Sequence, residues 1–221
     1  MRPLVLAILL CGIFAMAQQT SVPVDQEPMH KVVLKNEYVE VLHVSIPPGQ
    51  STLFHTHSHD GVVVHLAEGQ IRIDVPGSAS TSEVQNKHPG DVSAQAYSEA
   101  PFTRRVNNVG KTPFEVIDIE FLKRPEGVHA KAIAAPAAEN ESARVYKWEL
   151  AAGASSPPHG HERPYLVVSA TMVDLRMTAP DGTSLKHAVQ PGDIHWVDSK
   201  VTHTLINDGK APGVIVEVEL K

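Results

Sequence analysis

The chain contains almost no cysteine. Cys11 is the single one among 221 residues, so an internal disulfide, a zinc–thiolate site and a Cys/His nucleophile pair are excluded. A block of basic residues is also absent, since 19 Lys and Arg stand against 25 Asp and Glu for a net charge of −6. This balance predicts neither a nucleic-acid partner nor an anionic membrane partner.

Two catalytic motifs are missing as well. The sequence holds neither a Gly-x-Ser-x-Gly turn nor a glycine-rich phosphate loop, so serine hydrolases and nucleotide-binding enzymes have no support. Helix formers such as Leu and Lys are sparse, whereas 13 His and 17 Pro are present. An excess of imidazoles without thiols is therefore the feature to explain.

The first 17 residues have the pattern of a secretory signal peptide. Met1-Arg2 gives a short positive start, Leu4 to Phe14 is apolar, and Ala15-Met16-Ala17 is a small-x-small cleavage site. The apolar run is too short to span a bilayer, and no second apolar segment follows. We therefore expect residues 1–17 to be removed. The mature protein would be periplasmic or secreted, bacterial, without a membrane segment, and would carry a net charge of −7 because Arg2 is lost.

Two other interpretations of this segment stay open. One is a buried N-terminal helix. The other is a lipid anchor on Cys11, although Leu10 is larger than the residue usual at such sites.

The chain contains an internal repeat. Asn108-Val109-Gly110-Lys111-Thr112-Pro113 reappears 99 residues later as Asn207-Asp208-Gly209-Lys210-Ala211-Pro212. His55-Thr56-His57 reappears 104 residues later as His159-Gly160-His161. Small differences in offset between matching blocks are typical of insertions in loops. We infer a duplication with two copies of about 90–100 residues, each near the size of a domain.

Both copies have the signals of an all-β fold. Short runs rich in β-branched residues alternate with Pro-Gly, Asp-Gly and Glu-Gly turns, and no window keeps a helical period over three turns. Many short strands at regular spacing predict a β-barrel or jelly roll in each copy. The predicted strands are Val32 to Leu34, Tyr38 to Ile46, Val62 to Leu66 and Ile71 to Val75 in the first copy, and Val145 to Leu150, Tyr165 to Val168, Val173 to Met177 and Ile194 to Val197 in the second.

Composition sets the expected boundaries. Residues 18–29 form an N-terminal extension, 30–123 the first barrel, 124–142 an Ala/Pro/Glu-rich linker and 143–221 the second barrel. Two arrangements stay open: the barrels pack against each other within one chain, or they pair across a homodimer.

Each copy places two histidines two residues apart. Residues with this spacing project from the same face of a strand, so each pair presents two imidazoles side by side. Two imidazoles can hold a transition metal when a third ligand comes from elsewhere in the barrel. A surface metal-scavenging tract is the alternative, but the recurrence of the pair at the same place after a glycine argues against it.

The spacing around these pairs resembles the motifs of the cupins, which are double-sheet jelly rolls. The first cupin motif reads Gly, five residues, His-x-His, three or four residues, Glu, and the second ends in His, three residues, Asn. The resemblance covers nearly all of the mature chain, twice over, so the chain resembles a bicupin. In the second copy Gly153 precedes His159 and His161, and His203 precedes Asn207. The resemblance implies that His159, His161 and His203 bind one divalent metal, which would be Zn, Fe, Ni, Cu or Mn.

The second copy departs from the motif at its carboxylate position, where Tyr165 stands in place of Glu. Losing an anionic ligand weakens the site and leaves a position for water or substrate. Tyr165 and Asn207 are the candidates for supporting the ligands or contacting a substrate.

The first copy keeps His55 and His57, but Val62 occupies its Glu position and Arg104 replaces the third His. A guanidinium has no lone pair to offer and repels a metal, while His59 would partly compensate. We interpret His55, His57, His59 and Arg104 as a weak second site. It would bind a metal, an anion gripped by Arg104, or nothing.

The remaining polar residues receive structural interpretations. The rows Asp118/Glu120 and Glu217/Glu219 alternate with apolar residues, so we expect them on solvated strand faces rather than as catalytic carboxylates. His195 is interpreted as structural, as are the isolated histidines His30, His43, His65, His88, His129 and His187.

These observations predict a metalloprotein whose second barrel takes a small-molecule substrate or ligand. The resemblance implies a metal-dependent oxygenase or isomerase acting on a small organic molecule. The alternative is a non-catalytic bicupin that binds a small ligand and has decayed metal sites. A structural or oligomerising protein is a third class, because cupin-like barrels often pair through strand edges.

Overall fold

The structure is a computed structural model that describes residues 20–78, 82–127, 131–198 and 200–221. The predicted signal peptide at residues 1–17 lies outside the described residues. Apart from one turn of 3-10 helix, η1 (Val24–Gln26), the described part consists of strands and loops, which confirms the all-β prediction. No helix in these ranges is long and apolar enough to cross a membrane.

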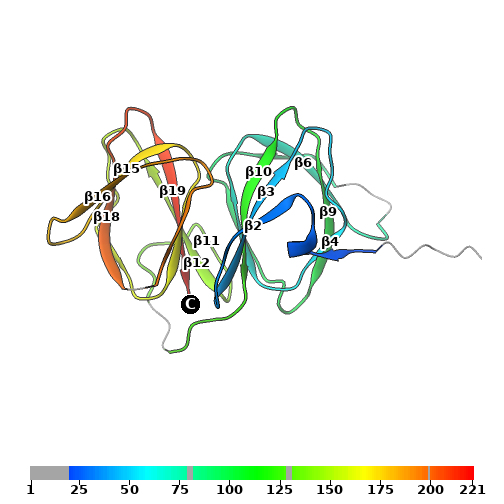
Figure 1. Cartoon of the computed structure of the whole chain (residues 1–221), viewed down its shortest axis with the longest axis horizontal. Coiled ribbons are helices and arrows are strands. Elements are labelled where there is room, and N and C mark those ends of the chain that lie inside the picture. The colour runs from blue at the N-terminus through cyan, green and yellow to red at the C-terminus, as the bar shows by residue number, and fades with distance from the viewer. Residues whose placement is uncertain (1–19, 79–81, 128–130, 199) are drawn as a thin grey trace, which may run out of the picture.

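The first barrel consists of two five-stranded sheets that face each other, in the blue-to-green half of Figure 1. One sheet has the order β1-β4-β9-β6-β7 and the other β2-β3-β10-β5-β8. The strands are β1 (Val22–Pro23), β2 (His30–Lys35), β3 (Val39–Ile46), β4 (His55–His57), β5 (Gly61–His65), β6 (Gly69–Asp74), β7 (Gln85–Lys87), β8 (Val92–Gln95), β9 (Phe102–Asn108) and β10 (Phe114–Phe121).

The second barrel repeats this architecture with one five-stranded and one four-stranded sheet, in the orders β11-β12-β19-β14-β17 and β13-β18-β15-β16. Its strands are β11 (Ala138–Glu139), β12 (Ala143–Leu150), β13 (His159–His161), β14 (Tyr165–Ser169), β15 (Val173–Thr178), β16 (Ser184–Val189), β17 (Ile194–Val197), β18 (Val201–Asn207) and β19 (Gly213–Leu220). All eight predicted strands are present, with ends shifted by at most two residues.

The duplication is visible in strand register and in turns. β4 pairs with β9 so that His55 is opposite Arg104, and β13 pairs with β18 so that His159 is opposite His203. The matching Pro-Gly-Asp turns place Gly90 at φ +82° and Gly192 at φ +87°, a conformation that L side chains rarely adopt. Arg104 therefore occupies the third-histidine position of the first barrel.

Two segments outside the predicted barrel ranges take part in the sheets. In the N-terminal extension, β1 runs parallel to β4, with Val22 opposite His55. In the linker, β11 pairs antiparallel with β12. The nearby Asn140 side-chain amide donates to the carbonyl oxygens of Gly61 and Gln95 in the first barrel. Both segments therefore help to hold the molecule together.

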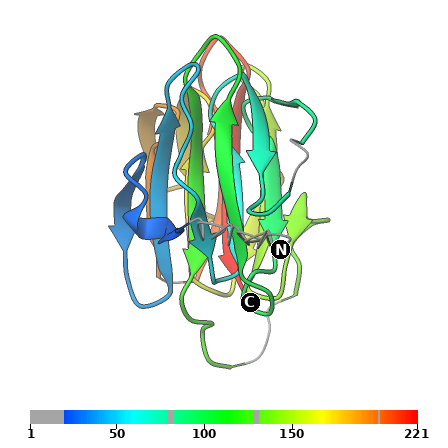
Figure 2. The same ribbon diagram turned by 90° about the vertical axis from the view of Figure 1, so that its right-hand side faces the viewer.

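The two barrels pack face to face within one chain. Side chains from β3, β5 and β10 meet those from β12, β14 and β19 in one hydrophobic core between the sheets. Figure 2 looks along this stack with the first barrel in front. Complete burial of one such aliphatic side chain contributes about 1.5–3 kcal/mol. Members of this inter-barrel core include Val39, Val41, Val62, Val64, Ile117, Ile119, Val145, Leu166, Val168, Val216, Val218 and Leu220.

Strands β10 and β19 are consequently buried on both faces. Their apolar rows point to the inter-barrel core, and their acidic rows point into their own barrels. Asp118 and Glu120 are 3% and 1% exposed, and Glu217 and Glu219 are 0% and 1% exposed. The prediction that these acidic rows are solvated is wrong. The alternation is real, but neither side of these strands faces water.

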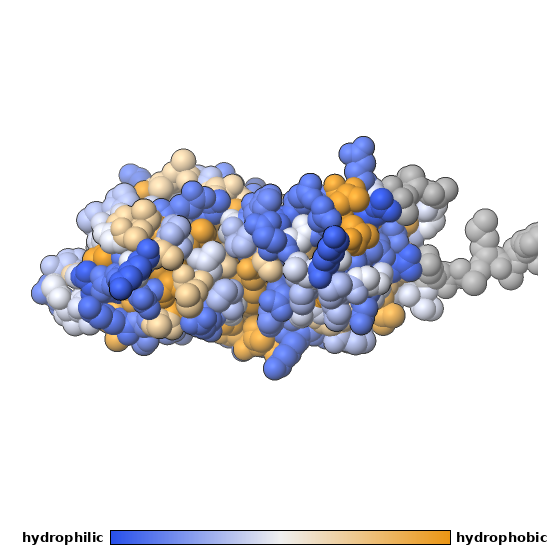
Figure 3. All heavy atoms as spheres, turned by 90° about the horizontal axis from the view of Figure 1, so that it is seen from above, coloured by the Kyte–Doolittle hydropathy of each residue, from blue (hydrophilic) through white to orange (hydrophobic). Residues whose placement is uncertain are grey.

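The outer surface is largely hydrophilic in the view of Figure 3, with apolar side chains scattered over it. Met172 and Leu185, at 62% and 57%, are the most exposed large hydrophobic residues in the described ranges. Isolated exposed apolar residues are ordinary on protein surfaces. The features that distinguish this molecule therefore lie inside the barrels.

Candidate metal centre

The second barrel brings three histidines and one glutamate together. β13 supplies His159 and His161, β18 supplies His203 and β19 supplies Glu217. All four residues are at most 8% exposed. One ligand atom from each lies within 4.8 Å of those of the other three. The three histidines named by motif spacing thus meet at one point inside the barrel.

The atoms at the centre are close enough to share one ion. His159 Nε2 lies 2.9 Å from His203 Nε2 and 2.9 Å from Glu217 Oε2. His203 Nε2 is 3.0 Å from Glu217 Oε1, and His161 Nε2 is 3.4 Å from Glu217 Oε2. Ligands that bind one metal at about 2.0–2.2 Å are separated from one another by about 3 Å. The observed spacing fits a common ion.

A hydrogen bond determines which ring nitrogen of His159 carries the proton. Its Nδ1–H donates to the carbonyl oxygen of Pro157 at 2.8 Å, so Nε2 of the neutral ring directs a lone pair toward the cluster. That lone pair faces the Glu217 carboxylate, whose Oε1 is buried without a hydrogen-bond partner. Converging acceptors repel each other unless a cation lies among them. The donor set therefore fits a divalent transition metal.

The charges of this cluster depend on one another. Burial alone would raise the pKa of Glu217, but the close contacts of its carboxylate with the imidazoles of His159, His161 and His203 outweigh burial and hold that pKa well below its usual range. Burial alone would lower the pKa of His161, but hydrogen bonds to Glu217 and Glu219 raise it to about 9. A positive charge is strongly favoured here, whether a proton or a metal supplies it.

Glu217 is the residue of the cluster that sequence reasoning missed. The cupin motif directs attention to the position just after the His pair, where Tyr165 stands, and the acidic row was expected in solvent. One signal could have found it. The row Glu217/Glu219 has a counterpart, Asp118/Glu120, at the same distance from the repeated Asn-x-Gly block. A row that only contacts solvent has no reason to recur at a fixed position.

Tyr165 lies against the cluster. Its ring stacks on that of His161 with centroids 3.8 Å apart, and its buried hydroxyl has no hydrogen-bond partner among the described residues. Burial, followed by the charges of Glu217 and Glu219, raises its pKa. The hydroxyl therefore stays protonated and can donate a hydrogen bond to a molecule bound at the centre.

The Asn207 side chain is hydrogen-bonded to backbone groups. Its Nδ2 donates to the carbonyl oxygens of Leu150 and Ala211, and its Oδ1 accepts from the Gly209 N–H. Asn108 makes the equivalent three bonds in the first barrel. These bonds anchor a loop and use both amide hydrogens of Asn207, while its role in supporting the ligands or contacting a substrate stays a prediction.

A mostly apolar cavity of about 300 Å³ adjoins the cluster. Val167 lines it and stands opposite Glu217 in the register of β14 and β19. Ile215 lines it two positions before Glu217 on the same strand. The cavity also has polar groups at Ser169, His187, Asp193 and His195. His187 and His195, which the sequence suggested were structural, thus face a cavity beside the cluster.

The four residues of the predicted weak site in the first barrel do not converge on one point. His57 Nδ1 lies 2.7 Å from Glu120 Oε1, and the half-exposed His59 has its Nδ1 3.6 Å from Glu120 Oε2. His55 and Arg104 line a cavity together with Asp118, and the ring of His55 lies 5.2 Å from that of His57. The replacement of the third histidine by Arg104 puts a cation beside these histidines in place of a metal ligand.

A smaller acidic cluster remains in the first barrel. Ligand atoms of His57, Asp118 and Glu120 lie within 4.8 Å of one another. Burial raises the pKa of Asp118 to about 6 and that of Glu120 to about 7. These carboxyls therefore hold less negative charge near neutral pH than Glu217 does.

The motif's carboxylate position in the first barrel also needs correction. Gly61 stands opposite Glu120, as Tyr165 stands opposite Glu219. Gly61, and not Val62, is therefore the counterpart of Tyr165. Val62 belongs to the inter-barrel core.

Comparison with known proteins places the chain in a family. No family model matches it. Over 84 residues it is 32% identical to the beta-alanine degradation protein BauB of Pseudomonas aeruginosa, covering 38% of this chain and 86% of that protein. The cupin 2 conserved barrel domain protein of Leptotrichia buccalis is similar over 87% of this chain and 88% of its own, with 12% identity and a TM-score of 0.52. The chain belongs to the cupin superfamily.

A two-barrel member of that superfamily, a bicupin, is also known with a metal. The structure of Bacillus subtilis oxalate decarboxylase, described with Mn(II) centres, is similar to this bicupin over 83% of the present chain and 69% of its own. The identity is 14% and the TM-score 0.52. At this identity the likeness shows the fold of the bicupin and leaves its activity to be argued from its own residues.

Proposed function

We propose that the bicupin binds one divalent transition metal in its second barrel and uses it to act on a small organic molecule. The observation that carries this proposal is the convergence of His159 Nε2, the rings of His161 and His203, and the Glu217 carboxylate on one buried point. Imidazole and carboxylate ligands suit Zn, Fe, Ni, Cu and Mn. We expect a single ion of this group per chain.

The chain's own residues surround that ion with a reaction site. When bound, the metal supplies Lewis-acid chemistry, or redox chemistry if it is iron or copper. The Tyr165 hydroxyl donates a hydrogen bond to an oxygen of the substrate. Val167 and Ile215 hold the apolar body of the substrate and exclude water. This division of roles supports a metal-dependent oxygenase or isomerase.

The cavity points to a class of substrate. Its walls are apolar, and its polar groups are few, so it suits a small molecule with an oxygen-bearing head and an apolar body. BauB is named for the degradation of β-alanine and the Bacillus enzyme for the decarboxylation of oxalate. Both compounds are small carboxylates. Small carboxylates are therefore the first substrates to test.

The competing proposal is a bicupin that binds a small ligand without transforming it. The loss of a metal-binding histidine at Arg104 favours this interpretation for the first barrel. Turnover decides between the two: a metal-loaded protein that binds small carboxylates but never converts them is a binding protein.

Measuring the metal content of the protein tests the proposed metal centre. The mature chain, expressed in metal-replete medium, is expected to carry about one equivalent of metal by elemental analysis, and added metal should raise its melting temperature. Glu217→Gln and His203→Ala should each weaken metal binding by more than the 10- to 100-fold that loss of a supporting residue typically costs.

The first barrel offers the matched control. Asp118 stands 99 residues before Glu217, so Asp118→Asn makes the same chemical change at the equivalent place and should leave the single equivalent intact. A wild-type protein without metal, whose melting temperature does not respond to added metal, would end the proposal. Metal that survives the loss of His203 would show that the ligand set is wrong.

We also propose that the mature protein is periplasmic or secreted, on the pattern of residues 1–17. N-terminal sequencing of the protein recovered from the periplasm or medium of a bacterial host should begin at Gln18. Recovery of the intact N-terminus from the cytoplasm would contradict the proposal.

A further inference from the structure

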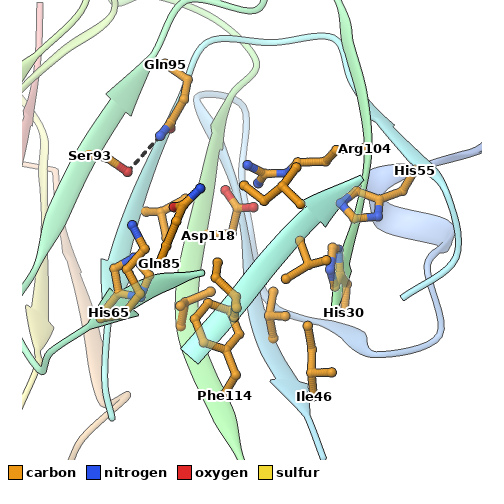
Figure 4. A pocket seen from close by; sticks show the side chains of 17 residues that line it. His30, Ile46, His55, His65, Gln85, Ser93, Gln95, Arg104, Phe114 and Asp118 are labelled. Carbon is orange, nitrogen blue, oxygen red and sulfur yellow. Dashed lines mark hydrogen bonds between the residues drawn. The ribbon is translucent and has the colours of Figure 1, made fainter. Parts of the chain in front are cut away.

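The first barrel encloses a cavity of about 260 Å³ that the proposed metal function does not use. In Figure 4 Ile46 and Phe114 lie at its lower end, His30 and His65 lie just above them, and Gln95, Arg104 and Asp118 lie in its upper part. Arg104 enters from β9 and Asp118 from β10, which belong to opposite sheets. The two side chains point toward one another across the upper part of the cavity.

Arg104 makes no ion pair or hydrogen bond with the described residues, although its charge lowers the pKa of the nearby Asp118 and Glu120. Its Nε is shielded from solvent and has no hydrogen-bond partner. No carboxylate of the described residues lies within ion-pairing distance of it. Its guanidinium presents donors in a planar fork that matches a carboxylate. The cavity therefore has one site for an anionic head group.

Acceptors face the same space. The Asp118 carboxylate is 3% exposed and lines the cavity. The Nδ1–H of His55 donates to the Leu53 carbonyl oxygen at 3.0 Å, so its Nε2 is an acceptor in the neutral ring. That Nε2 is buried and unpartnered. A plain anion would satisfy Arg104 but would leave these acceptors unpaired, and burying unpaired polar atoms is costly.

From this juxtaposition we propose that the first barrel is a metal-independent binding site for a free amino acid. The carboxylate of the ligand pairs with Arg104, its ammonium group lies between Asp118 and His55 Nε2, and its apolar side chain extends toward Ile46 and Phe114. A zwitterion supplies a partner for Arg104, for Asp118 and for His55 Nε2, and it adds no net charge to a buried space.

A metal on His57, Asp118 and Glu120 is the competing occupant. Arg104 opposes it, because the same guanidinium lies near these groups and repels a cation. Lys87 also lines the cavity and adds positive charge. The electrostatics of this barrel thus favour a ligand with an anionic group over a bare cation.

Calorimetric titration of the full mature chain with matched probes tests the proposal. L-Leucine carries both charges, 4-methylpentanoate keeps only the carboxylate and 3-methylbutylamine keeps only the ammonium. One charged hydrogen-bonding group is worth roughly a 10- to 100-fold change in affinity. L-Leucine, or another common amino acid that a thermal-shift screen selects in its place, should bind more tightly than either of its one-charge analogues by about that factor.

Substitutions separate the two ends of the ligand. Arg104→Gln should weaken binding of both leucine and 4-methylpentanoate by roughly 10- to 100-fold. Asp118→Asn should weaken the binding of leucine but tighten the binding of 4-methylpentanoate, because it removes a negative charge beside the carboxylate site. A general loss of folding would weaken the binding of both ligands, so opposite changes in their affinities cannot come from unfolding. His203→Ala in the second barrel should leave leucine binding unchanged.

Several results would overturn the proposal. Measured in the His203→Ala background, where the metal of the second barrel is lost, these are the absence of binding by every amino acid in the screen, equal affinity for leucine and 4-methylpentanoate, or binding that survives Arg104→Gln. A second metal equivalent that disappears in Asp118→Asn would identify a metal site instead. Because the second barrel keeps its own metal in Arg104→Gln, failure here and failure of the proposed metal centre give different results.

Discussion

At the scale of single residues, the pKa of a buried carboxylate in this molecule depends on the groups around it. Asp118 and Glu217 occupy equivalent positions of the two barrels, and both are buried. Burial raises the pKa of Asp118 to about 6. The same effect acts on Glu217, but close contacts with three imidazoles reverse it. The charge of such a residue is therefore a property of its cluster.

The buried His30 predicts a pH dependence of stability. Burial lowers its pKa to about 3 from the ordinary value of 6.5. The folded state therefore favours the neutral ring, and its contribution to stability is present above pH 6.5 and is lost as the pH falls from 6.5 toward 3. Its Nδ1–H donates to the Val24 carbonyl oxygen, a bond that a glutamine amide can replace.

His30→Gln should therefore reduce the loss of unfolding free energy between about pH 6.5 and 4.5 by about 2 kcal/mol. Urea unfolding of the wild type and the variant at these two pH values measures the difference. An unchanged loss in the variant would show that His30 is not a source of the acid sensitivity.

The hydroxyl of Tyr165 predicts a substitution with little cost. It is buried without a protein partner, so Tyr165→Phe removes an unpaired polar atom and should change unfolding free energy by less than about 0.5 kcal/mol. Tyr146 is the control, because its hydroxyl donates to Glu219 and accepts from the Ile133 N–H. Tyr146→Phe should destabilise by about 1–2 kcal/mol. Equal losses by chemical denaturation would mean that Tyr165 has a partner of its own.

Spacing along the chain was sufficient to find some residues of the centre and not others. His159, His161 and His203 are visible because two motifs with fixed intervals contain them. Glu217 is not, because its strand alternates like any half-buried strand, and only the tertiary structure shows which face meets the barrel interior. The same limit applies to His187 and His195, whose cavity forms between strands that are distant in sequence.

At the scale of elements, β19, which carries Glu217, begins at a residue that lies close against the start of β15. A Cβ atom at Gly213, the first residue of β19, would lie 2.3 Å from Val173 Cγ2. Gly213→Ala should therefore destabilise the protein by about 1–3 kcal/mol, the usual cost of overpacking. Thermal and urea unfolding measure it.

A second substitution identifies the cause. Val173→Ala removes the clashing methyl groups, so the Gly213→Ala/Val173→Ala double variant should lose less stability than the sum of the two single variants. Additive losses would show that the conformational freedom of glycine, and not space, is what β19 requires.

The strands themselves were predictable, because β-branched runs and glycine turns are local signals. β1 and β11 were not, since each has only two residues and owes its pairing to a neighbour that local sequence does not reveal. The exposure of β10 and β19 was also misjudged. A period of two shows that the faces differ, but not that one of them meets solvent.

At the scale of the whole molecule, the inter-barrel core predicts cooperative unfolding. Because side chains of both barrels form one cluster, a metal bound in the second barrel should also protect the first. Hydrogen exchange of β3, β5 and β10 should slow when metal is added at about 100 times its dissociation constant, where binding is worth about 2.7 kcal/mol. Protection confined to the second barrel would contradict a shared core.

The duplication and the jelly-roll class could be predicted at this scale, since repeats and turn spacing can be recognised directly in the sequence. The choice between packing within the chain and pairing across a dimer could not. It depends on whether the apolar rows that contain Val62, Ile119 and Val218 face outward from their barrels, and that is a property of the folded barrels.

The two-sided burial of β10 and β19 has a consequence for how the two copies have diverged. Their outward rows remain apolar at matching positions, as in the pairs Ile117/Val216 and Ile119/Val218. Substitutions that alter chemistry are found on the inward side, where Arg104 stands for His203. The chemistry inside one barrel can therefore change without altering the apolar surface by which that barrel supports its twin.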